Sequence, residues 1–164
     1  MFIGIQTRRI SSKWLSSHHP YTMPEEHKNK FPKGSLIVHE TVSYTDYALK
    51  RFFNEASKSD WFENTLFIIT SDHSGLTESK EYKTQLGLFK IPMIVYHPKM
   101  KQNIISKQFV QQIDVYPTVI DLLNIENEKI FTFGRSPFSE KDKYYIYYSN
   151  GEYLLMIGNY LSKY

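Results

Sequence analysis

The stretch Glu63-Asn64-Thr65-Leu66-Phe67-Ile68-Ile69-Thr70-Ser71-Asp72-His73-Ser74-Gly75 decides the fold of this chain. Leu66 to Ile69 is a continuous run of aliphatic and aromatic residues without a polar face, which is typical of a strand buried on both sides. Ser71 to Gly75 ends the run with polar and turn-forming residues. The stretch therefore predicts a central strand of an α/β sheet, with an acid and an imidazole at its carboxyl end.

Asp72 and His73 have the chemistry of metal ligands, and ligands of open α/β sheets bind outside the carboxyl ends of the strands. A carboxylate oxygen and a neutral imidazole nitrogen together suit manganese, zinc or magnesium, although two ligands make an incomplete site. A simpler interpretation is that Asp72 caps the turn and that His73 accepts a backbone hydrogen bond. The pair by itself leaves both interpretations open.

The composition excludes several classes of protein. The chain has 164 residues, which is usual for one domain, and its net charge of +3 comes from interspersed charges that form no nucleic-acid face. There is no cysteine, so disulfide scaffolds, cysteine-ligated zinc and thiol catalysis are excluded. No apolar run approaches the ~18 residues that a membrane span needs.

The rest of the chain alternates predicted strands, loops and helices. Residues 1–7 read as a strand without a lead-in, so we expect further sequence upstream. A polar connection and a stiff loop with His18 follow, and residues 76–89 form a loop long enough to cover a site. We further predict an amphipathic helix over 41–56, a second buried strand over 91–96, a helix with Asp114 as N-cap, and a hairpin of 144–149 and 153–157 around Asn150-Gly151.

Five pieces of this sequence, in this order, resemble the lipoteichoic acid synthase or phosphoglycerol transferase family of the sulfatase and alkaline phosphatase superfamily. They are Ser17-His18-His19-Pro20-Tyr21, Tyr44-Thr45-Asp46-Tyr47-Ala48-Leu49 through Phe53, Asn64 through His73, Ile91-Pro92-Met93-Ile94-Val95-Tyr96, and Gln112-Ile113-Asp114-Val115-Tyr116-Pro117-Thr118. Each piece alone is a weak signal, but five in the family's order are a strong one.

The resemblance implies an α/β fold with a sulfatase-like mixed sheet flanked by helices, incomplete at its amino terminus and ending in an antiparallel hairpin. It implies one partial catalytic domain over residues 1–164, with the terminal hairpin at 143–164. Asp72 and His73 would be two ligands of a single catalytic divalent metal, usually manganese in this family, with magnesium or zinc as alternatives. His18 would contact the phosphate or glycerol of the substrate.

The family's threonine nucleophile has no counterpart here and is expected upstream, so we expect this chain alone to be inactive. The resemblance implies the carboxyl-terminal half of a phosphoglycerol transferase that acts on phosphoglycerol lipids or other anionic esters, for envelope polymer or glycan modification. Its partner would be the missing amino-terminal part of the same enzyme, and it would lie at the cell membrane, facing outside or the periplasm. The alternatives are a sulfuric or phosphoric ester hydrolase of the same superfamily and a non-catalytic anion-binding module.

Overall fold

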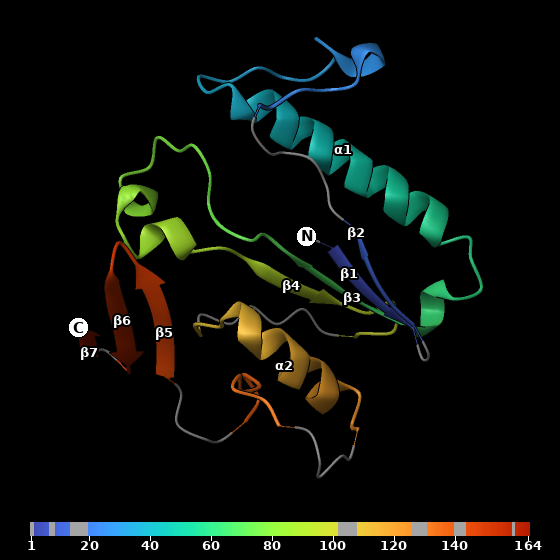
Figure 1. Ribbon diagram of the computed structural model, residues 1–164. Coiled ribbons are helices and arrows are strands. Elements are labelled where there is room, and N and C mark those ends of the chain that lie inside the picture. Colours follow the sequence, from blue (N-terminus) through green and yellow to red (C-terminus); the bar gives the residue numbers. More distant parts are fainter. Residues whose placement is uncertain are drawn as a thin grey trace. The chain divides into compact units, whose positions relative to one another are not determined.

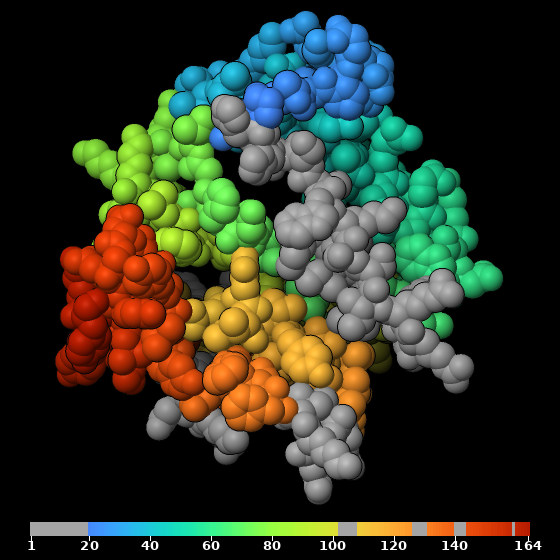
Figure 2. Space-filling view, viewed as in Figure 1, coloured from blue at the N-terminus to red at the C-terminus, as the bar shows by residue number. Residues whose placement is uncertain are grey.

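The computed structural model describes residues 2–6, 9–13, 20–101, 108–125, 131–139, 144–158 and 160–164. Side chains are described from residue 20 onward, and these residues carry colour in Figure 2. The chain divides into two compact units, Met1–Asn103 and Ile104–Tyr164. The single domain predicted over residues 1–164 stays a prediction.

The first unit contains a four-stranded sheet with the order β2-β1-β3-β4. Its strands are β1 (Phe2–Gln6), β2 (Arg9–Lys13), β3 (Thr65–Thr70) and β4 (Met93–Tyr96) (Figure 1). Each neighbouring pair is antiparallel. The predicted first strand is confirmed as β1, whereas β2 lies in the segment that we expected to be a polar connection.

The core of the first unit forms where β3 meets the helix α1 (Val38–Ala56). As predicted, β3 is buried on both faces: Phe67 is 1% exposed and Ile68 is 0% exposed. Aromatic rings dominate the packing because Phe52 and Phe53 on α1 pack against Phe67 in edge-to-face and tilted arrangements, with ring centroids 6.4 and 5.2 Å away. The helix predicted over residues 41–56 is therefore confirmed, and it begins three residues earlier than expected.

The strand predicted over residues 91–96 is shorter and less buried than expected. It is β4, whose residues alternate between partly buried and exposed, and Ile94 is 51% exposed. The reason is its place in the sheet, since β4 is the last strand in the described order and pairs only with β3. The segment before it, which we predicted as a loop, contains two short 3-10 helices, Glu81–Lys83 and Gly87–Phe89.

The second unit contains the helix α2 (Val115–Leu122) and a three-stranded antiparallel sheet. The strands follow the order β5 (Tyr144–Ser149), β6 (Glu152–Ile157) and β7 (Tyr160–Lys163). The predicted hairpin is confirmed as β5 and β6. Its turn residues Asn150 and Gly151 both have positive φ, +53° and +85°, as a type I′ turn requires.

Asp114 organises the start of α2 in a different way from the predicted cap. Its side chain does not cap α2; instead Oδ2 accepts the N–H of Gln111 at 2.8 Å and Oδ1 accepts the N–H of Arg135 at 2.7 Å. The backbone approaches closely here, since a Cβ on Gly134 would lie 2.0 Å from the carbonyl oxygen of Ile113. One carboxylate therefore joins the turn before α2 to a loop 21 residues after Asp114.

Candidate metal centre

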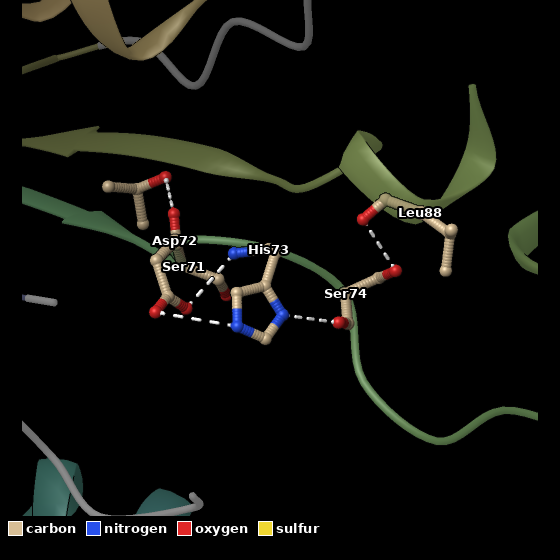
Figure 3. Close-up of polar contacts among 6 residues, drawn as sticks. Ser71, Asp72, His73, Ser74 and Leu88 are labelled. Carbon is tan, nitrogen blue, oxygen red and sulfur yellow. Dashed lines mark hydrogen bonds and ion pairs between the residues drawn. The ribbon is translucent and has the colours of Figure 1, made fainter. Parts of the chain in front are cut away.

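The end of β3 holds the candidate site (Figure 3). Thr70, the last residue of the strand, is 7% exposed, and its hydroxyl donates a hydrogen bond to the carbonyl of Pro92 at 3.0 Å. The antiparallel pairing of β3 with β4 explains this contact, because the chain leaving β3 passes the chain entering β4. Asp72 and His73 thus come directly after a strand end that is held in place by burial of Thr70 and by its bond to Pro92.

Asp72 and His73 are brought together by a local hydrogen bond. The backbone N–H of His73 donates to Oδ1 of Asp72 at 3.0 Å. The other carboxylate oxygen, Oδ2, lies 3.7 Å from Nε2 of His73, and both side chains are 59% exposed. Oδ1 of Asp72 thus accepts a backbone N–H, in line with the simpler interpretation of this residue, while Oδ2 lies near the imidazole.

The electrostatics keep Asp72 ionised. Partial burial raises the pKa of this carboxyl, but the backbone N–H groups of His73 and of Asp72 itself lower it, as does the positive charge of the His73 ring in its protonated form, and the lowering is larger. The net result is a pKa below the usual value for an aspartate. At neutral pH the group is therefore the anionic ligand that a hard divalent cation prefers.

The imidazole of His73 has the protonation pattern of a metal ligand. Its Nδ1 lies 2.6 Å from the carbonyl oxygen of Ser74. A carbonyl only accepts hydrogen bonds, so Nδ1 carries the proton and the lone pair of the neutral ring is on Nε2. Metal-binding histidines typically donate their second ring N–H to a backbone carbonyl or carboxylate in this way.

The two side chains fit one divalent cation. Two ligand atoms that each lie about 2.1 Å from one ion can be at most about 4.2 Å apart, and the observed separation of 3.7 Å is within that limit. Among the described residues no group of three or more His, Asp or Glu could hold a metal. Within the described part of the chain, Asp72 and His73 are therefore a candidate pair of ligands without a third beside them.

The predicted site residues have different outcomes. Asp72 and His73 lie together at the carboxyl end of a buried strand, as the sequence predicts. His18 lies outside the described residues. Sequence reasoning missed Ser74, which lies next to the pair and binds both His73 and Leu88 through hydrogen bonds. The sequence feature that could have indicated this role is a serine in a loop, because serine hydroxyls in loops commonly form hydrogen bonds with nearby backbone groups.

Residues 14–125 match the Sulfatase family, which covers more than half of the chain and includes the end of β3. The chain belongs to the sulfatase family, a family of enzymes. It is 26% identical over 157 residues to lipoteichoic acid synthase 1 of Bacillus subtilis (strain 168), a match covering 85% of this chain and 24% of the relative. It is 25% identical to the lipoteichoic acid synthase of Staphylococcus aureus (strain USA300), with the same two shares.

A crystal structure of a protein in the alkaline phosphatase superfamily from Vibrio parahaemolyticus has the same fold. The TM-score is 0.61 at 24% identity, and the match covers 90% of this chain and 38% of that chain. The α/β fold and the resemblance on which it was predicted are thus confirmed. The chain spans about a quarter of the length of the curated relatives that it matches.

Proposed function

We propose that this chain supplies the metal-binding part of a sulfatase-like phosphoglycerol transferase. Asp72 and His73 hold one divalent cation, manganese in preference to magnesium or zinc. The substrates are phosphoglycerol lipids or similar anionic esters, and the reaction serves envelope polymer or glycan modification. The observation that carries the proposal is the 3.7 Å separation between Oδ2 of Asp72 and Nε2 of His73, within the segment that matches the sulfatase family.

The chemistry of the pair supports this role. A bound divalent cation neutralises charge on the non-bridging oxygens of a phosphate ester and lowers the pKa of an attacking hydroxyl. Asp72 contributes the negative charge that holds such a cation, since its carboxyl has a lowered pKa. His73 contributes a neutral nitrogen whose direction is set by its bond to Ser74.

We propose His18 as the residue that contacts the phosphate or glycerol of the substrate. The strand register supports this proposal. Lys13 at the end of β2 pairs with Phe2, and Phe2 pairs with Ile69 near the end of β3. Strands β2 and β3 therefore run in the same direction, and their carboxyl ends lie on the same side of the sheet. His18 follows Lys13 by five residues.

Catalysis requires a nucleophile from outside residues 1–164, because the family resemblance assigns its threonine to no residue of this chain. The partner that we propose is accordingly the remaining part of the same enzyme. We place the active enzyme at the cell membrane, facing outside or the periplasm, from the relatives that it resembles. Among the described residues, no helix combines the length and the apolar character that crossing a membrane would take.

Manganese titration followed by electron paramagnetic resonance tests the metal site, because the signal of the free ion falls on binding. We expect binding weaker than about micromolar, since two protein ligands are an incomplete site. The variants Asp72→Asn and His73→Gln should each weaken it about tenfold or more. The matched controls are Asp60→Asn and His97→Gln, which replace an exposed aspartate and a histidine that also follows a strand and should leave binding unchanged.

An activity assay separates the proposed function from its alternatives. The isolated chain should turn over neither phosphoglycerol lipids nor aryl phosphate or sulfate esters. Turnover that Asp72→Ala abolishes would show that the chain is a complete hydrolase and would contradict the need for an outside nucleophile. Micromolar or tighter manganese binding without turnover would favour an anion-binding module instead.

A further inference from the structure

Ser74 makes three hydrogen bonds beside the candidate ligands, and Figure 3 draws those of its hydroxyl and of its carbonyl. Its hydroxyl donates to the carbonyl oxygen of Leu88 at 2.7 Å, and its backbone N–H donates to the same oxygen at 3.0 Å. Its own carbonyl accepts the Nδ1–H of His73 at 2.6 Å. We propose that Ser74 is a positioning residue, which holds His73 in the Nδ1–H tautomer and so directs the Nε2 lone pair toward Oδ2 of Asp72.

The anchor for Ser74 is itself well held. Leu88 belongs to the 3-10 helix Gly87–Phe89, and its N–H donates to the carbonyl of Thr84 at 3.0 Å. A carbonyl oxygen has two lone pairs, so Leu88 can accept both bonds from Ser74 without competition. The segment that leads into β4 thereby fixes the loop that leaves β3.

The hydroxyl is the specific contribution of a serine at this position. Any residue other than proline would supply the N–H and the carbonyl, but the 2.7 Å bond to Leu88 needs a side-chain donor. This bond restricts rotation of the peptide whose oxygen faces His73. Without it, we expect the Ser74 carbonyl to sample orientations in which Nδ1 of His73 loses its acceptor.

Two other histidines show that the tautomer depends on local contacts. Nδ1 of His97 accepts the N–H of Lys99 at 3.1 Å, and Nδ1 of His39 accepts the N–H of Leu36 at 3.3 Å. An accepting nitrogen carries no proton, so these two rings are Nε2–H tautomers when neutral. His73 is therefore expected to give the opposite signature within the same molecule.

Long-range ¹H–¹⁵N NMR of the metal-free chain at pH 8 reads out these tautomers directly. We expect the Nδ1–H form for His73 and the Nε2–H form for His97. In Ser74→Ala the ratio of Nδ1–H to Nε2–H at His73 should fall about two- to tenfold, the range for losing one net hydrogen bond. Ser74→Thr keeps a hydroxyl and should restore the ratio, whereas the tautomer of His97 should not change in either variant.

The same samples then receive manganese, and paramagnetic broadening at His73 reports binding. Ser74→Ala should need a higher manganese concentration for equal broadening, by a similar factor. Only the manganese experiment rests on the proposed function, because the tautomer measurement needs no metal. An Nε2–H tautomer of His73 in the unaltered chain, or an unchanged ratio in Ser74→Ala, overturns the positioning role. Absent broadening together with the expected tautomers refutes the proposed function and supports the positioning role.

Discussion

Replacing Asp114 by asparagine tests how one carboxylate holds the second unit together. The carboxylate accepts two backbone N–H groups, one on each oxygen, at 2.8 Å from Gln111 and 2.7 Å from Arg135. Asparagine has almost the same shape but only one accepting oxygen. Its NH₂ group would face one of the two N–H donors, so one bond is lost and replaced by a donor–donor contact.

The expected cost follows from these two bonds. A hydrogen bond to a charged group contributes about 1.5–3 kcal/mol, and a neutral acceptor provides roughly half of that. Losing one bond and weakening the other should therefore lower the local stability by about 2–4 kcal/mol. A contrast is available in Asp121, whose carboxylate accepts one hydrogen bond among the described residues, from the hydroxyl of Ser136 at 2.5 Å. Asp121→Asn keeps an acceptor for that donor and should cost less than about 1.5 kcal/mol.

Native-state hydrogen exchange measures this effect at the relevant amides. Protection of the Gln111 and Arg135 amides should fall by about 30-fold or more in Asp114→Asn, since each 1.4 kcal/mol is tenfold. Protection of amides in β3, in the other unit, should stay the same. Equal losses in the two aspartate variants would refute the reasoning, because they would show that the second acceptor oxygen of Asp114 is not needed.

Three further predictions concern packing, backbone strain and pH. Ile68→Ala, at a site that is 0% exposed, should lower the free energy of unfolding by about 2–5 kcal/mol, whereas Ile94→Ala, at 51% exposure, should lower it by less than about 1 kcal/mol in urea denaturation. Gly151→Ala should cost about 1–2 kcal/mol because φ is +85°, while Gly75→Ala, at a position with open space for a Cβ, should be nearly neutral by the same measurement. Burial raises the pKa of the Tyr145 hydroxyl, and the negative charge of Asp114 raises it further. Site-resolved ¹³C NMR should show the pKa of Tyr145 above 10.0 in the unaltered chain and lower in Asp114→Asn. The stability that the protonated hydroxyl provides is present below the pKa of the unfolded state and is lost as the pH rises through the pKa of the folded state.

Local sequence signals predicted the elements whose cause is local. The apolar run of β3 could be buried only between two layers, and burial on both faces is what the structure shows. Asn150-Gly151 predicted the hairpin of β5 and β6 because few other pairs adopt positive φ at low cost. The adjacent Asp72 and His73 could likewise be placed at a strand end from the sequence alone.

Elements whose cause lies in distant residues could not be predicted in this way. Arg9–Lys13 contains one aliphatic residue and has weak strand propensity, yet it forms β2 because β1 offers it a pairing edge. The apolar run at β4 resembled that of β3, but its exposure depends on how many strands flank it. The local sequence reveals neither how many strands will flank β4 nor which strand β2 will pair with.

The support of the candidate site follows from the direction of pairing, which the sequence does not reveal. In a parallel sheet, the loops after neighbouring strands would gather around Asp72 and His73. Here β3 and β4 are antiparallel, so the segment before β4 lies beside the loop after β3. Thr70 and Ser74 both donate their hydroxyl hydrogens to carbonyls of that segment. A loop that was expected only to cover a site is therefore hydrogen-bonded to the segment that carries the two candidate ligands, and under the proposed function substitutions there should change metal affinity without touching the metal.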